Sequence, residues 1–203
     1  MERKRRVLAA LTLTAIFFIA SPAARAEDPA RALYDRGVRA LTKGDAATAV
    51  DAFRKALEIS PDFVEAHYAL ARSYEEAGFT NLAIKSYRKA VELRPDWVEA
   101  HFSLGACRLR LGSRVEAIGA FTRVVQLNAD HVEAHRALAS IYEEEGWADM
   151  AIKAYKKVVE LDPDDPEICR RLGLLYRKTG NKDEEKAWHD KYMSLKKAKE
   201  ATE

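Results

Sequence analysis

Three histidines, His67, His101 and His135, recur at a step of 34 residues and have a type and spacing that could suggest a metal site. Zinc requires several nitrogen or sulfur ligands at about 2.0–2.3 Å from one centre. If each histidine belongs to a different helical repeat, the side chains lie roughly 10 Å or more apart, because packed helices are separated by about 8–10 Å. We therefore expect packed or half-exposed structural histidines, no metal site and no cofactor.

Runs of carboxylates at Glu75-Glu76 and Glu143-Glu144-Glu145 are the next candidates for chemistry, because paired acids can act as general acid and base. Such a role needs burial or a like-charged neighbour in a pocket, which shifts the pKa of one carboxyl group. Both runs come shortly before a turn glycine, where we expect solvated surface. The sequence also lacks a phosphate-binding glycine loop and a nucleophile elbow. We therefore expect no enzymatic activity.

A third series at the same step changes from aromatic to basic along the chain: Tyr34, Tyr68, Phe102, Arg136 and Arg170. Aromatic and arginine side chains dominate the energetics of protein interfaces, and a guanidinium group pairs well with a carboxylate. We expect an apolar anchor of a ligand to bind the rings, and an acidic group or C-terminus to bind the arginines. The candidate peptide-binding residues are Tyr34, Tyr68, Phe102, Arg72, Arg136, Arg170 and Arg171.

An internal repeat indicates the elements that position these side chains. Glycines occur every 34 residues from Gly44 to Gly180, and small, aromatic and proline residues follow the same step. Within a unit the apolar residues are spaced three and four apart, which indicates helices rather than strands. A glycine ends the first helix of each unit, and a proline such as Pro95 stops the second. Each unit is therefore predicted to be a pair of antiparallel helices.

Five such units, counted from Ala30, cover residues 30–63, 64–97, 98–131, 132–165 and 166–199. We call the position of a residue within its unit, from one to 34, its place. An aspartate at place 33 and a glutamate at place two of the next unit, such as Asp62 and Glu65, are predicted to cap the following helix. The more polar fifth unit is predicted to be a capping repeat. Residues 27–29 form a short lead-in and residues 200–203 a tail.

The residues that recur in these units follow a known pattern. In the second unit they are Leu70, Ala71, Tyr74, Gly78, Ala83, Tyr87, Ala90 and Pro95, and in the fourth Leu138, Ala139, Tyr142, Gly146, Ala151, Tyr155, Val158 and Pro163. This pattern closely resembles the tetratricopeptide repeat (TPR) family. The resemblance implies an all-α fold, a right-handed α-solenoid of antiparallel helix pairs whose first helices line a concave groove. In that family a tyrosine at place five is also common for packing reasons.

The resemblance implies a non-enzymatic scaffold or adaptor that binds an extended peptide or the surface of a partner protein. Two alternatives stay open: a chaperone-like assembly or maturation factor of the bacterial envelope, and a structural protein that associates with itself. Of the 34 basic and 32 acidic residues, five basic residues but only one acidic residue lie in the first 26 positions. The remaining chain is therefore slightly acidic, and we expect no nucleic-acid partner.

Residues 1–26 have the layout of a secretory signal peptide: the basic run Arg3-Lys4-Arg5-Arg6, an apolar stretch over residues 7–20, and a polar end. Ala24 and Ala26 form the small-x-small pattern that signal peptidase requires. As a helix, the apolar stretch would be roughly 21 Å long, against about 30 Å for the hydrocarbon core of a bilayer. We expect cleavage after Ala26 and export to the bacterial periplasm or the medium. The alternative is an uncleaved N-terminal membrane anchor.

The two cysteines, Cys107 and Cys169, invite a disulfide in an exported protein. They belong to first helices that are separated by a whole unit, whereas a disulfide requires Cα atoms within about 7 Å. We therefore expect two buried free thiols that pack as small apolar side chains.

Overall fold

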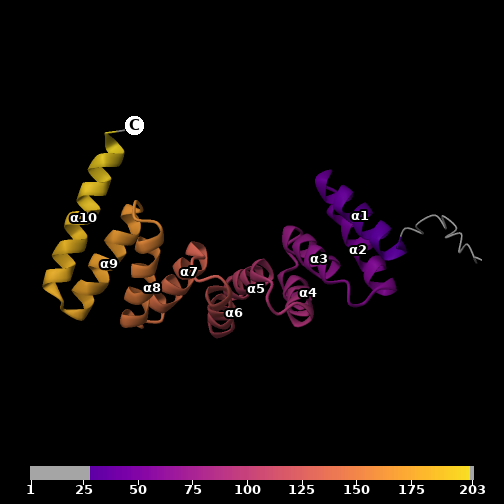
Figure 1. Ribbon diagram of the computed structural model, residues 1–203, viewed down its shortest axis with the longest axis horizontal. Coiled ribbons are helices and arrows are strands. Elements are labelled where there is room, and N and C mark those ends of the chain that lie inside the picture. The colour runs from indigo at the N-terminus through magenta and orange to yellow at the C-terminus, as the bar shows by residue number, and fades with distance from the viewer. Residues whose placement is uncertain (1–27, 202–203) are drawn as a thin grey trace, which may run out of the picture.

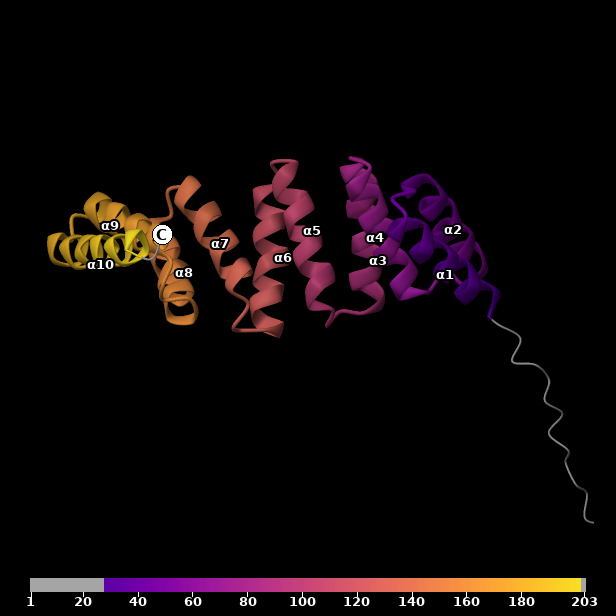
Figure 2. The same cartoon turned by 90° about the horizontal axis from the view of Figure 1, so that it is seen from above.

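The computed structural model describes residues 28–201, which form ten α-helices and no strands. The helices are α1 (Pro29–Thr42), α2 (Ala46–Ile59), α3 (Val64–Glu76), α4 (Thr80–Leu93), α5 (Val98–Arg110), α6 (Arg114–Leu127), α7 (Val132–Glu144), α8 (Ala148–Leu161), α9 (Pro166–Thr179) and α10 (Lys182–Glu200). They form an elongated array of helix pairs (Figure 1), which the view from above shows as well (Figure 2). The predicted all-α solenoid is confirmed. The predicted signal peptide, residues 1–26, lies outside the described residues.

Helix packing in this array is local. The most extensive contacts are within the pairs α1–α2, α3–α4, α5–α6, α7–α8 and α9–α10. The next are between the second helix of one pair and the first helix of the following pair. Each unit therefore buries its apolar surface mainly against itself and its neighbours in the chain, as in other repeat proteins.

The turn inside each pair explains the repeated glycine. The five glycines of these turns have φ between 75° and 80°: Gly44, Gly78, Gly112, Gly146 and Gly180. No non-glycine residue in the described part of the chain has a positive φ. A residue with a Cβ rarely adopts this left-handed conformation. The glycine step predicted these turns correctly.

The starts of the first helices differ from the prediction. The residue that precedes α3, α5 and α7 is at place 34, namely Phe63, Trp97 and His131. Asp62 and its equivalents therefore lie one residue too early to cap a helix. His131 accepts a hydrogen bond from the backbone N–H of Ala134 (3.3 Å). Among the described first helices, α1 and α9 have an aspartate that caps with its carboxylate, namely Asp28 and Asp165.

The histidines at place four have a structural role at the same turns. The Nε2 atoms of His67, His101 and His135 lie 2.8, 3.0 and 2.9 Å from backbone carbonyl oxygens at place 32. Each histidine thus ties the start of a first helix to the turn that precedes it. Among residues 28–201, no group of three or more His, Cys, Asp or Glu side chains is arranged to hold a metal ion.

The core of each of the first four units is built on a buried aromatic residue at place 24, which packs against the first helix near place eight. In the first and third units place eight is a glycine. A Cβ atom on Gly37 would lie 2.5 Å from the Phe53 ring, and one on Gly105 would lie 2.9 Å from the Phe121 ring. Both rings are almost fully buried, so a shift of either ring would disturb the core around it. The close approach of the two helices therefore requires glycine at these positions.

The units alternate between two kinds of core. The first and third units combine glycine at place eight and leucine at place 12 with phenylalanine at place 24, whereas the second and fourth combine alanine, glutamate and tyrosine. The four sets are Gly37–Leu41–Phe53, Ala71–Glu75–Tyr87, Gly105–Leu109–Phe121 and Ala139–Glu143–Tyr155. The tyrosine hydroxyl thus occurs only where a carboxylate is available at place 12.

The fifth unit, predicted to be a capping repeat, lies at the C-terminal end of the array. No residue of α10 is fully buried, but Trp188 packs against the core formed by the third, fourth and fifth units. Cys107 and Cys169 are buried and unbridged, as expected from their separation.

The close contact at place eight generates a stability prediction. Gly105→Ala should lower the free energy of unfolding by about 1–3 kcal/mol, because the new Cβ overpacks against Phe121. Gly173→Ala is the matched control, because the nearest atom to its Cβ would be 3.7 Å away. This control should raise stability by about 0.5–1 kcal/mol through helix propensity. Urea unfolding measures both, and equal gains in stability would contradict the steric argument.

Candidate functional site

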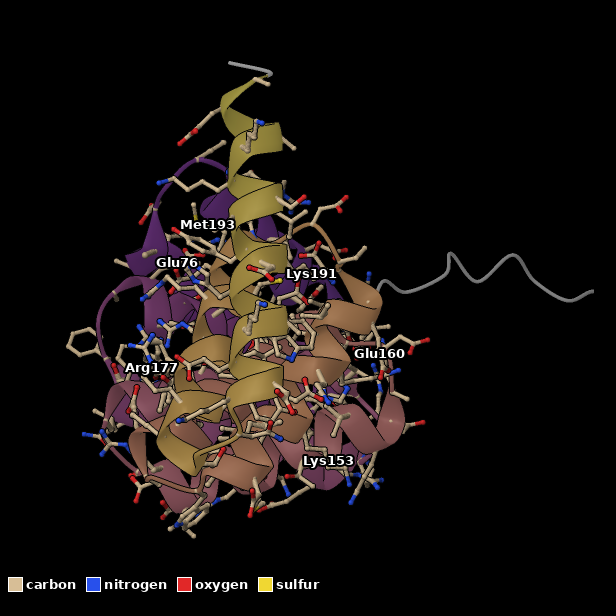
Figure 3. The ribbon with its side chains drawn as sticks, turned by 90° about the vertical axis from the view of Figure 1, so that its left-hand side faces the viewer. Glu76, Lys153, Glu160, Arg177, Lys191 and Met193 are labelled. Carbon is tan, nitrogen blue, oxygen red and sulfur yellow. The ribbon has the colours of Figure 1, made fainter. Side chains whose placement is uncertain are left out.

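The helix pairs give the array two faces. The first-helix face is formed by α1, α3, α5, α7 and α9, and the second-helix face by α2, α4, α6, α8 and α10. Seen from the C-terminal end, Glu76 and Arg177 of first helices lie on the opposite side of the molecule from Lys153 and Glu160 of α8 (Figure 3). All seven candidate residues from the sequence are on first helices.

The three aromatic residues at place five are half-buried, and each lies between two other rings of its own unit. One neighbour is the core aromatic residue at place 24, and the other is the ring at place 34. The ring centroids are between 4.5 and 5.5 Å apart, close enough for direct ring packing. The three sets are Phe53–Tyr34–Phe63, Tyr87–Tyr68–Trp97 and Phe121–Phe102–His131. The rings therefore have a packing role and expose only part of their surface.

The second unit extends its set of rings with a cation. The guanidinium group of Arg94 lies 4.6 Å from the centroid of the Trp97 ring and forms an ion pair with Glu65. The hydrogen bond from Arg94 lowers the pKa of the Glu65 carboxyl group. Trp97 and Arg94 were not predicted from the sequence to be part of this face. Their signal is an aromatic residue at place 34 together with an aromatic residue at place five.

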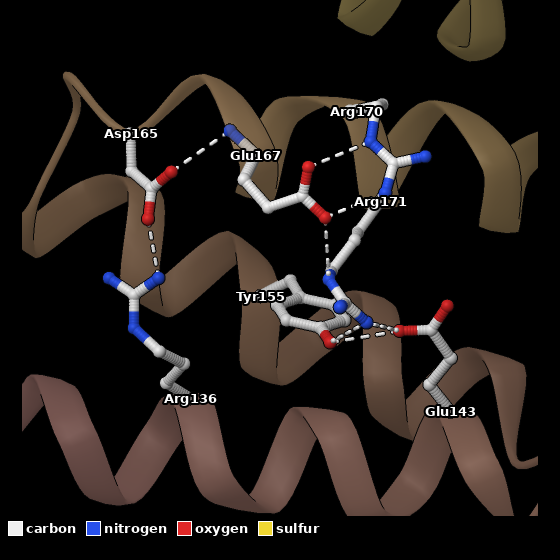
Figure 4. A network of polar contacts seen from close by, with 7 residues as sticks. All are labelled: Arg136, Glu143, Tyr155, Asp165, Glu167, Arg170 and Arg171. Carbon is white, nitrogen blue, oxygen red and sulfur yellow. Dashed lines mark hydrogen bonds and ion pairs between the residues drawn. The ribbon is translucent and has the colours of Figure 1, made fainter.

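In the fourth unit an ion pair replaces the rings (Figure 4). Arg136 is at place five and donates hydrogen bonds to Asp165, at place 34, and to Asp162 at 3.4 Å. Burial of Asp165 acts to raise its pKa, but hydrogen bonds from Arg136 and from the backbone N–H of Glu167 outweigh burial, so the pKa is lowered. The carboxylate therefore stays ionised and holds Arg136 in place.

The remaining candidate arginines also have carboxylate partners. Arg170 donates two hydrogen bonds to Glu167, both at 2.7 Å, and Arg171 donates one to Glu167 at 3.1 Å. Arg72 lies 3.4 Å from Glu76. The structure thus brings Arg136 of α7 and Arg170 and Arg171 of α9 close together on neighbouring first helices (Figure 4). A ligand carboxylate would have to compete there with the protein's own acids.

The carboxylate runs are only partly the solvated surface that the sequence predicted. The Glu75 side chain is 29% exposed, accepts a hydrogen bond from the Tyr87 hydroxyl (2.9 Å), and pairs with Arg110 of the next unit. Correspondingly, the Glu143 side chain is 19% exposed and accepts hydrogen bonds from Tyr155 and Arg171, both at 2.9 Å. The prediction was wrong for these two residues because each helix end turns the first acid of the run toward a buried hydroxyl group.

These polar contacts form two equivalent junctions between units. Each consists of a glutamate at place 12, the tyrosine hydroxyl at place 24 and an arginine of the next unit. Burial, together with the Glu143 carboxylate, raises the pKa of Tyr155 to about 12, and the pKa of Tyr87 is raised for the same reasons. Both hydroxyl groups therefore stay protonated as donors. The sequence signal that identifies such a junction is a glutamate at place 12 together with a tyrosine at place 24. The first and third units, which have leucine and phenylalanine at these places, lack the junction.

Two family models match the repeats of this chain. Residues 67–196 match the family model described as the cilia and flagella-associated protein 70 middle TPR-like domain, and residues 41–78 match the model of the TPR repeat. A comparison with curated protein sequences found no match.

Several solved structures are similar along most of the chain. One crystal structure of MamA protein is 30% identical, covers 86% of this chain and 96% of its own, and has a TM-score of 0.78. A second crystal structure of MamA is 31% identical, with coverages of 81% and 96% and a TM-score of 0.73. YrrB, described as a TPR protein with an unusual peptide-binding site, is 21% identical, with coverages of 80% and 84% and a TM-score of 0.71.

The junction at Glu143 can be tested by exchanging one core for the other. Glu143→Leu should lower the free energy of unfolding by about 1–3 kcal/mol, because Tyr155 and Arg171 lose their acceptor. Adding Tyr155→Phe creates the Leu–Phe pair of the first and third units and should recover part of the loss. Chemical denaturation measures this. If the double variant loses as much free energy of unfolding as the two single variants lose together, the two residues are not coupled and the prediction is contradicted.

The ion pair in the fourth unit predicts a dependence on pH. The pKa of Asp165 in the folded protein lies below its unfolded value of about 3.9, so its stabilising effect is present above about pH 4 and is lost as the pH falls through the folded pKa. Arg136→Met should therefore be about 1 kcal/mol less stable than the unaltered protein at neutral pH, and the difference should shrink below about pH 4. Urea unfolding at several pH values tests this. A difference independent of pH would contradict it.

Proposed function

The chain belongs to the tetratricopeptide repeat family, and from this premise we propose that its first-helix face binds an extended peptide or the surface of a partner protein. The protein acts as a non-enzymatic scaffold. One observation carries the proposal: half-buried rings at place five give way along this face to arginines whose ion pairs are accessible to solvent.

The arginines of this face have different roles in the proposal. Arg136 pairs with acids of its own unit, one of which, Asp165, caps α9, and Arg171 pairs with Glu143 of the preceding unit, so both are positioning residues. By contrast, Arg170 and Glu167 are 45% and 47% exposed. An exposed ion pair is worth about 0–1 kcal/mol, so a ligand carboxylate can replace Glu167 at little cost. Arg72 is similarly exposed beside Glu76. We therefore assign ligand binding to Arg72 and Arg170.

The apolar part of the ligand would bind beside Phe102. Ala106 of the same helix and Ala137 of α7 are half-buried next to the core, so the surface around this ring is lined by small side chains. The helices are already formed and held by their neighbours. Binding therefore costs little ordering of the protein, which favours recognition of an extended segment. The peptide-binding site named for YrrB, which has the same fold, also supports a peptide ligand.

We also propose that the protein is exported. The support is the tripartite leader in residues 1–26. In the described part of the chain, no helix has the length and apolar character to cross a membrane. Mass spectrometry of the protein recovered from the cell envelope should find Glu27 at the N-terminus. An intact leader would indicate the membrane-anchored alternative instead.

Groove variants test the binding function. Crosslinked pull-down from the envelope fraction first supplies a stoichiometric partner, and fluorescence anisotropy then measures the affinity of its binding peptide. The double variant Arg72→Glu, Arg170→Glu should weaken binding by about tenfold or more, because charge-assisted hydrogen bonds to the ligand are lost.

The matched control is Lys55→Glu, Lys153→Glu, which makes the same charge change on α2 and α8 and should leave the affinity unchanged. If the arginine variant binds as tightly as the unaltered protein, the first-helix face is not the binding surface. Equal binding of many unrelated unfolded chains would instead favour the chaperone-like function.

A further inference from the structure

A hollow of about 340 Å³ lies on the second-helix face, between α2 and α4. Its base is formed by Leu70 and Tyr74 of α3, and its sides include Leu57 of α2 and Leu82 of α4. The Leu82 residue is 45% exposed. An apolar side chain that entered this hollow would therefore remove apolar surface of the protein from water, which is favourable.

The rim of the hollow is basic. Arg54 of α2 and Lys85, Arg88 and Lys89 of α4 line it, together with one acid, Glu92. Glu92 lies 3.7 Å from Arg88. Neither Lys85 nor Lys89 forms an ion pair with another residue of the described chain. The positive charge at the rim is thus only partly neutralised, in contrast to the paired arginines of the first-helix face.

The next two junctions do not repeat this combination. Between α4 and α6, Arg108 takes the place of Tyr74 at the base and Glu116 takes the place of Leu82 at the side, so the equivalent surface is polar. Between α6 and α8 the base is apolar again. There, the ammonium group of Lys157, at the place of Lys89, lies 3.5 Å from a carboxylate oxygen of Asp130 and 3.7 Å from one of Glu160. Lys153, at the place of Lys85, forms no ion pair with another described residue, so among these three junctions the first is the one that combines an apolar base with two unpaired lysines.

The last junction shows what chemistry fits these places. Trp188 of α10 stands at the place that Ser86 has in α4, and it packs against the core. Its indole N–H donates to Glu184 (2.8 Å), and Glu184 lies 3.7 Å from Lys156. Lys156 has the same place as Arg54. An aromatic ring with a carboxylate one helical turn before it thus satisfies the last junction from within the chain, whereas the small Ser86 leaves the first junction open.

We propose that the hollow between α2 and α4 is a second docking site, which binds an acidic helical segment of a partner protein. The segment inserts a large apolar side chain onto Leu70 and Tyr74. A carboxylate one turn away from that side chain pairs with the basic rim, chiefly with Lys85 and Lys89. This site lies on the face opposite the peptide-binding surface proposed above, so the protein would connect two partners.

The probe for the test is a short fluorescein-labelled helical peptide with one Trp and glutamates one turn before it, on an alanine and glutamine background. Its anisotropy should report saturable binding that weakens as salt is added. Lys85→Glu with Lys89→Glu should weaken binding by about tenfold or more. Ser86→Trp, which introduces the side chain found at the last junction, should also abolish binding by filling the hollow.

Two matched controls isolate the rim charges. Lys153→Glu with Lys157→Glu changes the same places in α8 and should leave binding unchanged. A probe with lysines in place of the glutamates should not bind. Circular dichroism and urea unfolding confirm that each variant is folded before its affinity is compared.

Several outcomes would overturn the proposal. These are no binding at peptide concentrations up to about 1 mM, equal binding by the Lys85, Lys89 variant, or equal binding of the lysine probe. Loss of binding in the Arg72, Arg170 variant would place the probe on the first-helix face, which overturns this inference and leaves the proposed function intact. Binding of phosphatidylglycerol vesicles through Lys85 and Lys89, without peptide binding, would assign the hollow to a lipid surface instead.

Discussion

The contact between the aromatic residue at place 24 and the small residue at place eight determines the other contacts in each of the first four units. A phenylalanine ring lies so close to the first helix that only glycine fits opposite it, as at Gly105. A tyrosine brings a hydroxyl group into a buried position, and a buried hydroxyl group needs a partner. That partner is a glutamate at place 12, and the glutamate in turn binds an arginine of the next unit. The choice of one ring thus determines the contacts at the junction that follows.

Much of the fold could be predicted because its determinants are local. A left-handed turn needs glycine, and a helical face needs apolar residues three and four apart, so both leave a signal in the sequence of each unit. The caps of α3, α5 and α7 were predicted wrongly because the residue at place 34, whose ring packs on place five or beside it, occupies the N-cap position in place of the aspartate. In this packing Tyr68 contacts Trp97, although the two residues are 29 positions apart in the sequence and are not part of one short sequence motif.

The candidate site was less predictable for the same reason. The arginines were identified from their type and step, but their partners, such as Asp165 for Arg136, come from the end of the same unit. The sequence analysis treated Glu75 and Glu143 as members of acidic runs. Their burial depends on which way the end of the helix turns, and this is decided by packing against the second helix. The burial of these glutamates is indicated in the sequence by a tyrosine at place 24 wherever place 12 is a glutamate. This signal becomes visible only when several units are compared.

The alternation of the two cores has a consequence for how such an array can change in length. Removal of the third and fourth units together would bring Glu75 opposite the arginine at place six of the last unit, which already binds Glu143 in the same way. Removal of the third unit alone would replace Arg110 by Glu144 at place 13, so two carboxylates would meet at the junction. Duplication of the second unit would give the same mismatch, because Glu75 would face the Glu76 of the added copy. The charge pattern therefore allows the third and fourth units to be removed together but not the third unit alone.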